Sequence, residues 1–592
     1  MKKKLLTGLL LLSATAMLGA CGTRTSSQTS NEGTITSTET GLDAQVSESQ
    51  FTEADTSEVS VSEGDPTITL NGSTGTISDT TRGSSGATVQ ITSKGTYWVT
   101  GSSQDVTIEV YDTTESGTVY LVLDNVSMTH SSSACILVRK ADKVIIQTIG
   151  ASTLTSTMSA EAKDADGNSI NATIMARDDL TMSGSGTLNV NSSKYKGISC
   201  KDDLKITDGT LIVVSEKAAL DANDSIRIGG GKINATSNSK DAVHVENDDS
   251  TAYYYQDAGE VTLAANKSDG IKSNLGDNAK VSYDGGITIS GATVNITAGG
   301  GSSKSKNSSE SQKGVKTEGL LKISDGTLSV SAADDALHSD DDILISGGTV
   351  NVSSSDDGVH AEDTLTIEGG TVNVTKSYEG LEAYVVNIAG GNINIAASDD
   401  GINAAGGSDS SSGESPWSYG GASSSTGTLN ISGGDIYVSC SGDGLDSNGS
   451  LYISGGNIIV EQSGNGNGPL DYGDGSSCVC QISGGTVLAI GSASMAVNFN
   501  SGSQCSALIG CSGSAGTLIS QEDSGFSYTA KKSFSSAVFS SPKMSKGNTY
   551  TFKIGDTAYT LDFSQSLYYS SIQGGNTGGG PGNQGGGRGN PW

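Results

Sequence analysis

Carboxylate side chains recur at regular intervals in this sequence, and such spacing could build a cation site. The stretch SDDGVHAEDTLTIEGG, residues 355–370, contains five carboxylates among single apolar residues. Similar stretches precede and follow it, and in each of them an acidic residue stands directly before the Gly or Ala of a turn. These acidic residues are Asp241, Asp269, Asp335, Asp357, Glu379, Asp400 and Asp443.

If the repeats stack as parallel strands, these residues lie above one another at a spacing of about 4.8 Å. Like charges at that distance repel by about 1 kcal/mol per pair in water, and by more when they are partly desolvated. Ca²⁺, which takes roughly six to eight oxygen ligands, would remove the repulsion. The ligands that we predict are Asp335, Asp340, Asp357, Glu362, Glu379, Asp400 and Asp443. The alternative is that Asp-Gly pairs are good turn formers and the charges are solvated.

A second set of residues follows the first apolar residue after each turn. It contains three of the four histidines of the chain. Because these residues alternate with apolar ones, we expect them to point outward while the apolar residues fill the core. The set is Asp221, His244, Lys272, Lys316, His338, His360, Glu382, Asn403 and Asp446.

The elements that must position these side chains are short strands. The repeated unit is an apolar residue, any residue, Ile, any residue, Gly-Gly, and then alternating Val, as in ILISGGTVNVSSSDDGVHA. Period-two alternation between Gly turns is typical of strands, and a repeat of about 21–22 residues is typical of one coil of a solenoid. We therefore predict an all-β fold, a right-handed parallel β-helix over residues 66–515, with a small β cap over 516–572.

The ends of the chain look different from the repeats. Residues 1–21 combine three lysines, an apolar stretch and the sequence LGAC, which predicts a lipoprotein signal peptide with lipidation of Cys21. Residues 22–65 are predicted to be a flexible linker rich in Ser, Thr and Glu, and residues 573–592 a Gly-rich tail. These features predict an extracellular monomer, lipid-anchored at the outer face of a bacterial membrane.

Net charge limits the partners. The chain carries a formal charge of −31, which argues against nucleic acid and against contact with a membrane other than through the lipid anchor. An acidic polymer would bind only through cations.

At this point the sequence resembles a known family. The residues that carry the resemblance are GTYWVTGSSQDVTIEV (95–110), VYLVLDNVSMTHSSSACILVRKADKVIIQT (119–148) and the repeated ISGGTVNVSSSDDGVHAED. They resemble clostridial carbohydrate-binding domain-containing β-helix proteins, which are polysaccharide-lyase-like. The resemblance implies Ca²⁺ on the repeats and binding to cellulose and to acidic plant polysaccharide such as polygalacturonate.

Three functions stay open at this point. A polysaccharide-binding module would stack aromatic rings on sugars, and the candidate contacts are Trp417, Tyr419, Tyr378, Tyr384, His338 and His360. A lyase of the pectate-lyase type would use Lys272 or Lys316 as the base beside Ca²⁺; the alternative for both lysines is to balance nearby carboxylates. An adhesin or structural rod would need neither sugar nor base.

Overall fold

The computed structural model describes residues 49–570, except residue 115 and residues 249–250, 277–278, 280–281 and 406–426. All described residues belong to one compact unit. The predicted signal peptide with Cys21, the predicted sugar contacts Trp417 and Tyr419, and the Gly-rich tail lie outside the described residues. None of the helices in the described part of the chain has the length and apolarity needed to cross a membrane.

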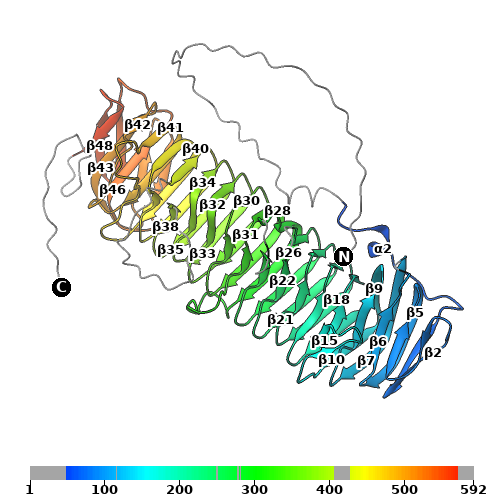
Figure 1. Ribbon diagram of the computed structural model, residues 1–592. Coiled ribbons are helices and arrows are strands. Elements are labelled where there is room, and N and C mark those ends of the chain that lie inside the picture. The colour runs from blue at the N-terminus through cyan, green and yellow to red at the C-terminus, as the bar shows by residue number, and fades with distance from the viewer. Residues whose placement is uncertain are drawn as a thin grey trace, which may run out of the picture. The chain divides into compact units, whose positions relative to one another are not determined.

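The repeats fold into short strands that pair in parallel with the strands one repeat before and after them. Pairing joins residues about 22 positions apart, as in Val350 with Val372 and His338 with His360. The strands follow one another in chain order from β2 to β48 (Figure 1). Three ladders of strands result, which we name ladders 1, 2 and 3.

Ladder 1 carries the TVNV-type segments. Its strands are β10 (Ala151–Ser156), β15 (Thr187–Ser192), β18 (Thr210–Ser215), β21 (Lys232–Ser237), β24 (Glu260–Ala265), β31 (Thr349–Ser353), β33 (Thr371–Ser377), β35 (Asn392–Ala397) and β38 (Asp435–Cys440). Burial alternates along them, since Val and Ile point into the core and Asn, Thr and Ser point outward.

Ladder 2 follows the acidic turns. Its strands are β6 (Thr107–Tyr111), β8 (Ile136–Lys140), β13 (Ala172–Ala176), β16 (Lys196–Cys200), β19 (Leu220–Ala222), β22 (Val243–Asn247), β25 (Ile271–Leu275), β27 (Val315–Thr317), β29 (Leu337–Ser339), β36 (Ile402–Ala404) and β39 (Leu445–Ser447).

Ladder 3 carries the segments before the Gly-Gly corner. Its strands are β9 (Lys143–Ile149), β14 (Asp179–Ser183), β17 (Asp203–Ile206), β20 (Ser225–Ile228), β23 (Tyr253–Gln256), β30 (Ile343–Ile345) and β37 (Thr428–Ile431).

Several long strands run through two ladders. Those shared by ladders 3 and 1 are β5 (Gly95–Gln104), β7 (Thr118–His130), β26 (Gly286–Ala298), β28 (Leu320–Ala332), β40 (Ser450–Gln462) and β41 (Cys480–Gly491). Those shared by ladders 2 and 3 are β32 (Val359–Ile367) and β34 (Leu381–Ile388).

These long strands correct the predicted fold class. All-β structure is confirmed, but a right-handed parallel β-helix built from separate coils is the wrong description. The pairing closes 12 parallel strands into a barrel, and the other strands lie outside it. The closed path runs β7, β9, β14, β17, β20, β23, β26, β24, β21, β18, β15, β10 and back to β7.

The physical reason lies at the corners. The repeat pattern predicts that a strand ends at the Gly-containing corner, yet β26 passes this corner with a bulge at Ser290 and stays hydrogen-bonded on both sides. Hydrogen bonds therefore join ladders that the repeat pattern separates, and one sheet contains 43 strands.

Other elements lie at the ends and on the flank of this sheet. At the N-terminal end are β1 (Thr67–Gly72), β2 (Thr74–Ile77), β3 (Gly83–Ser84) and β4 (Thr88–Ile91), and a short hairpin is formed by β11 (Ala162–Lys163) and β12 (Ser169–Ile170). Helix α2 (Glu53–Thr56) packs against β14. Near the C-terminal end are β42 (Ser501–Gly502), β43 (Ser506–Gly513), β46 (Phe534–Ser540) and β49 (Leu567–Tyr569). A separate antiparallel sheet contains β45 (Phe526–Thr529), β44 (Leu518–Gln521), β47 (Thr549–Ile554) and β48 (Thr557–Asp562).

Candidate functional site

A column of turn residues runs along the start of ladder 2, with one residue from each repeat. The residue after each member donates its backbone N–H to the carbonyl oxygen of the next member: Gly314 donates to Asp335 and Ala336 donates to Asp357, both at 2.9 Å. We name this set the turn column: Asp241, Asp269, Lys313, Asp335, Asp357, Glu379, Asp400, Asp443 and Gly468. The predicted stacking of the acidic turn residues is confirmed.

Carboxylates of the turn column use one oxygen to hold the next turn. The backbone N–H of Asp357 donates to Asp335 Oδ1 at 3.1 Å, and that of Glu379 donates to Asp357 Oδ1 at 3.1 Å. The backbone N–H of Asp443 donates to Asp400 Oδ1 at 2.5 Å. These side chains are therefore turn formers, as the simpler interpretation of Asp-Gly pairs requires. Each of them also has a second oxygen for another partner.

The turn column contains a lysine that the sequence prediction missed. Lys313 lies between Asp269 and Asp335, and its carbonyl oxygen accepts the backbone N–H of Gly270 at 3.0 Å. The signal was present in the sequence, because Lys313 begins a KGV stretch that matches DGV in a later repeat. A cation thus takes the position that an acidic residue takes in the neighbouring repeats.

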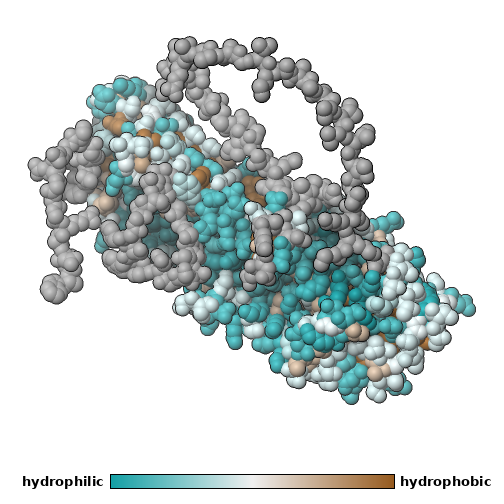
Figure 2. Space-filling model, in the orientation of Figure 1, coloured by the Kyte–Doolittle hydropathy of each residue, from teal (hydrophilic) through white to brown (hydrophobic). Residues whose placement is uncertain are grey.

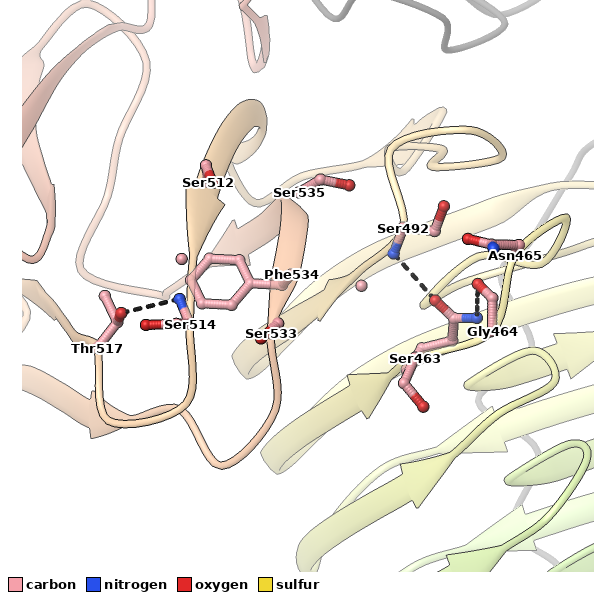
Figure 3. A pocket seen from close by; sticks show the side chains of 13 residues that line it. Ser463, Gly464, Asn465, Ser492, Ser512, Ser514, Thr517, Ser533, Phe534 and Ser535 are labelled. Atoms are coloured by element: carbon pink, nitrogen blue, oxygen red, sulfur yellow. Dashed lines mark hydrogen bonds between the residues drawn. The ribbon is translucent and has the colours of Figure 1, made fainter.

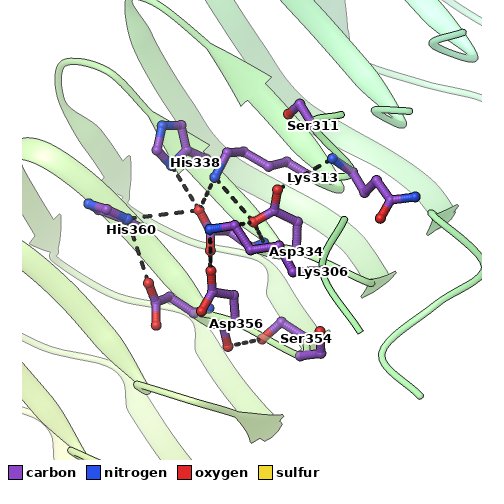
Figure 4. A network of polar contacts seen from close by, with 12 residues as sticks. Lys306, Ser311, Lys313, Asp334, His338, Ser354, Asp356 and His360 are labelled. Carbon is purple, nitrogen blue, oxygen red and sulfur yellow. Dashed lines mark hydrogen bonds and ion pairs between the residues drawn. The ribbon is translucent and has the colours of Figure 1, made fainter. Parts of the chain in front are cut away.

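Two lysines balance the carboxylates in this part of the column (Figure 4). Lys306 Nζ lies 2.5 Å from Asp356 Oδ2 and 3.3 Å from Asp334 Oδ1. Lys313 Nζ lies 3.5 Å from Asp334 Oδ1 and also contacts Asp335 Oδ2. Because the side chains of Lys313 and Asp335 are only 5% and 0% exposed, salt screens their ion pair little.

Histidines complete the same network. His338 Nδ1 lies 3.0 Å from Asp335 Oδ2, and His338 Nε2 lies 2.8 Å from Asp340 Oδ1. Burial would raise the pKa of Asp335, but Lys313 and His338 hold it well below its ordinary value. Burial would likewise lower the pKa of His338, yet its two carboxylate partners raise it. The charge of Asp335 is therefore already balanced by the protein.

Farther along the column, Asp400, Asp443 and Asp446 form a cluster without such cations. One oxygen of each lies within 4.8 Å of one oxygen of each of the others. No ion pair reaches these three side chains within the part of the chain that the structure describes. Burial, and then repulsion by neighbouring acids such as Asp471, raises the pKa of Asp400 to about 6, that of Asp443 to about 7 and that of Asp446 to about 8.

Glu379 connects the two parts of the column. Burial raises its pKa to about 7, even though Asn403 Nδ2 donates a hydrogen bond to Glu379 Oε2 at 2.8 Å. Asp357, one repeat earlier, has a pKa well above its ordinary value because of burial and the charges of Asp335 and Glu382. Burial and like charge therefore disfavour the ionised form of both carboxyl groups.

The second predicted set is also stacked. The register of ladder 2 places its members side by side in the predicted order, with Ser199 added before the first: Ser199, Asp221, His244, Lys272, Lys316, His338, His360, Glu382, Asn403 and Asp446. Lys272 and Lys316 are half-buried neighbours. Burial raises the pKa of Glu318, and these two lysines act against that rise. Both lysines therefore balance carboxylates, whatever further role they have.

The expectation that all these side chains point into solvent is wrong. They lie outside the apolar core, but Asp221, His338 and His360 are buried. The two histidines pack against each other and against acidic side chains of the neighbouring repeats. Their burial disfavours the predicted contacts with sugar. Among the other predicted ligands, Asp340 lies beside His338, and Glu362 is half-buried on β32.

Tyr378 is the best exposed aromatic candidate among the described residues of the acidic turns. Its side chain is 48% exposed, and it directly precedes Glu379. A hydrogen bond to Asp399 raises the pKa of Tyr378. Tyr384, on β34, is half-buried. Tyr378 therefore combines an accessible ring with a place beside the acidic column.

An open groove lies away from the turn column. It has a volume of about 670 Å³ and lies beside β41, β43 and β46. Its walls are hydroxyl-rich and uncharged, with serines around the ring of Phe534 (Figure 3). The face of the molecule in Figure 2 is mostly hydrophilic, with only small hydrophobic areas. None of the predicted site residues lines the groove.

Comparison with known proteins then identifies the family. The model of a family described as carbohydrate-binding domain-containing protein matches residues 85–358 and 355–524, a span that includes the whole turn column. The chain belongs to this family. The carbohydrate-binding family expected from the resemblance is thus confirmed, whereas the lipoprotein, β-helix and substrate features expected with it are not.

One relative in this family is a carbohydrate-binding domain-containing protein from Acetivibrio thermocellus. It is 39% identical over 127 residues, which are 21% of this chain and 44% of that protein. The chain therefore spans less than half the length of this relative. A solved structure, of a polysaccharide lyase-like protein from C. thermocellum as a gadolinium derivative, is 31% identical and covers 39% of this chain and 94% of that chain, with a TM-score of 0.33. That TM-score is too low to support an argument about fold or site.

Family membership supports carbohydrate as the ligand class.

Proposed function

We propose that this protein binds an acidic polysaccharide, such as polygalacturonate, through Ca²⁺ held at the C-terminal part of the turn column. The observation that carries the proposal is the cluster of Asp400, Asp443 and Asp446 without a counter-cation. Carboxylate oxygens and turn carbonyls are the donors that Ca²⁺ prefers. Asp400, Asp443 and Asp446 would provide carboxylate ligands, with Glu379 and Asp357 next in the column.

Charge explains why a cation would join the protein to its ligand. At a net charge of −31 the chain repels an ionised polymer. A cation held by protein carboxylates can also accept carboxylate oxygens from the polymer. Sugar specificity would then come from rings stacked beside the ion, and Tyr378 is placed for that contact. We propose Trp417 and Tyr419 as further contacts. We also propose cellulose as a second polymer, which would bind through aromatic side chains and without Ca²⁺.

We further propose that the protein works at the cell surface. The LGAC sequence and the preceding apolar stretch motivate a lipid anchor on Cys21, on the outer face of a bacterial membrane. Labelling of cells with radioactive palmitate tests this proposal. Loss of label in a Cys21→Ala variant is expected, and unchanged label would contradict it.

A calcium-dependent lyase is the alternative function. Lys272 and Lys316 are its candidate bases, and both are half-buried among carboxylates that they help to balance. The appearance of unsaturated sugar products from polygalacturonate would favour the lyase. A surface adhesin would bind neither polymer nor Ca²⁺.

Calorimetric titration of Ca²⁺ into the chelator-treated chain tests the proposed binding function. The titration is run with and without polygalacturonate on wild type, on Asp443→Asn/Asp446→Asn, and on Asp325→Asn. Asp325 is an exposed acid outside the column, so its variant controls for loss of charge alone. Ca²⁺ uptake that only the double variant loses, and that polymer binding requires, is the expected result. The proposal would be overturned if all three proteins took up the same amount of Ca²⁺, or if none of them took up any.

A further inference from the structure

The two parts of the turn column share their backbone geometry and differ in their cations. Asp335 Oδ1 and Asp400 Oδ1 both accept the backbone N–H of the next column member. Asp335 Oδ2 is in contact with Lys313, whereas no hydrogen bond or ion pair engages Asp400 Oδ2 in the described chain. The second oxygen is therefore occupied in one part and open in the other.

The lysines come from an anchored segment. Residue Ser302 donates its backbone N–H to Ser331 Oγ at 3.0 Å, and Lys376 contacts the carbonyl oxygen of Ser302. At the other end, Ser311 Oγ and the Lys313 backbone N–H both donate to Asp269 Oδ1 at 2.7 Å. Contacts on both sides thus hold Lys306 and Lys313 over the carboxylates.

The carboxylates beneath these lysines are arranged like those of an ion site. One oxygen each of Asp334, Asp335 and Asp356 lies within 4.8 Å of the others, as in the open cluster. The cation position is filled by the two ammonium groups (Figure 4).

We infer that Lys306 and Lys313 are tethered counter-ions that close a latent Ca²⁺ site at Asp334, Asp335 and Asp356. The segment of residues 299–313 then decides how many ions the turn column takes, and confines them to the Asp400 end. This inference concerns the regulation of the proposed Ca²⁺ site and rests on the proposed function for its role. It also makes a prediction that the function alone does not make: removal of two positive charges creates a metal site.

The experiment counts Ca²⁺ ions per chain for Lys306→Met/Lys313→Met, by calorimetry and by elemental analysis after dialysis. Met keeps an unbranched stem of similar length and removes the charge. One additional ion relative to wild type is expected, together with a larger rise of the melting temperature on addition of Ca²⁺. Lys304→Met is the matched control, since Lys304 is an exposed residue of the same segment, and its ion count should equal that of wild type.

No additional ion in the folded double variant would overturn the inference. A variant that folds only with Ca²⁺ supports it, because the ion then replaces the lost counter-charge. If the double variant does not fold in either condition, Lys306→Met alone decides the question, because Lys306 is partly exposed and its loss leaves Lys313 in place. An additional, weaker ion is then expected, and an unchanged count contradicts the inference.

The same measurement separates this inference from the proposed function. Uptake by wild type that Asp443→Asn/Asp446→Asn removes reports on the open cluster. Uptake gained only by the lysine variant reports on the latent site. If wild type binds no Ca²⁺ and the lysine variant binds one ion, the proposed function is contradicted and the latent site is supported.

Discussion

At the scale of single residues, all three carboxyl groups of the open cluster have a raised pKa. The pKa of Asp400 is raised to about 6, that of Asp443 to about 7 and that of Asp446 to about 8, first by burial. In the unfolded chain an Asp carboxyl titrates near pH 3.9. Between about pH 4 and pH 8 the folded state therefore binds more protons than the unfolded state, and its stability falls as the pH rises through that window.

We therefore expect the melting temperature of the chelator-treated protein to fall by about 5 °C between pH 5 and pH 8. Ca²⁺ should restore most of the loss at pH 8, since the ion replaces the protons. Calorimetric scans across this pH range measure both effects. In Asp443→Asn/Asp446→Asn the fall should be about halved, whereas Asp325→Asn should behave like wild type. A fall that is identical in all three proteins would place the titrating groups elsewhere.

The sequence was sufficient to predict the order of the acidic column, because a repeat of constant length fixes which residues stack. It did not predict which residues are solvated. The ion pairs of Asp334 and Asp356 with Lys306 depend on a segment outside the repeat, and its path over the column has no periodic signal. Lys313 lies within the periodic signal, but its positive charge breaks the acidic pattern on which the prediction rests.

At the scale of elements, the segment that contains α2 is held by a buried charge. Asp55 is fully buried, and its carboxylate accepts hydrogen bonds from Lys143 Nζ at 2.8 Å and from Thr181 Oγ1 at 2.7 Å. Burial would raise the pKa of Asp55, but these and other hydrogen bonds lower it to about 2. Its stabilising effect is present above about pH 4 and is lost as the pH falls toward 2.

Asp55→Ala should lower the free energy of unfolding by about 3 kcal/mol at pH 7, because Lys143 then keeps a poorly paired charge. Denaturant titration measures the loss, and proteolysis should cut earlier within residues 49–59. Glu53→Ala removes an exposed acid from the same helix and should change stability by less than about 0.5 kcal/mol. Equal effects of the two variants would show that Asp55 does not hold this segment.

The Gly that follows the acidic turn residue in most repeats has a packing role. A Cβ on Gly401 would lie 2.1 Å from Val438 Cγ1 and 2.6 Å from the carbonyl oxygen of Gly444. Gly401→Ala should therefore cost about 1–3 kcal/mol. Ala336 occupies the equivalent position in another repeat, so Ala336→Gly should cost only about 1 kcal/mol. Denaturant titrations of both variants would contradict this explanation if Gly401→Ala were neutral.

The strands themselves were well predicted from the alternation of apolar and polar residues. The closed path of strands was not, because it depends on whether a corner interrupts hydrogen bonding. In β26 the chain turns at a bulge without leaving the sheet. The identity of a corner residue does not reveal this; the backbone path does.

At the scale of the whole molecule, the C-terminal end is closed by antiparallel pairing. Strand β46 pairs with both β41 and β43, and a second apolar core, which includes Phe539 and Phe552, lies beneath it. Without β46, the edges of β41 and β43 and this apolar core would be exposed to solvent.

A chain that ends at residue 515 should therefore aggregate, whereas a chain that ends at residue 570 should not. Size-exclusion chromatography with light scattering measures the difference. A shortened chain that stays monomeric and melts like the full chain would show that the end needs no closure.

The turn column can also be treated as a one-dimensional lattice. Each node is occupied or empty, and only adjacent nodes interact, because a neighbour lies one repeat away and the next lies twice as far. Lys313 is a node whose occupant is covalently attached, between Asp269 and Asp335. A node that is always occupied separates the nodes on its two sides. Binding on one side is then independent of binding on the other. Proton binding at the nodes before Lys313 should therefore carry no information about ion uptake after it, however strongly the nodes within each half are coupled.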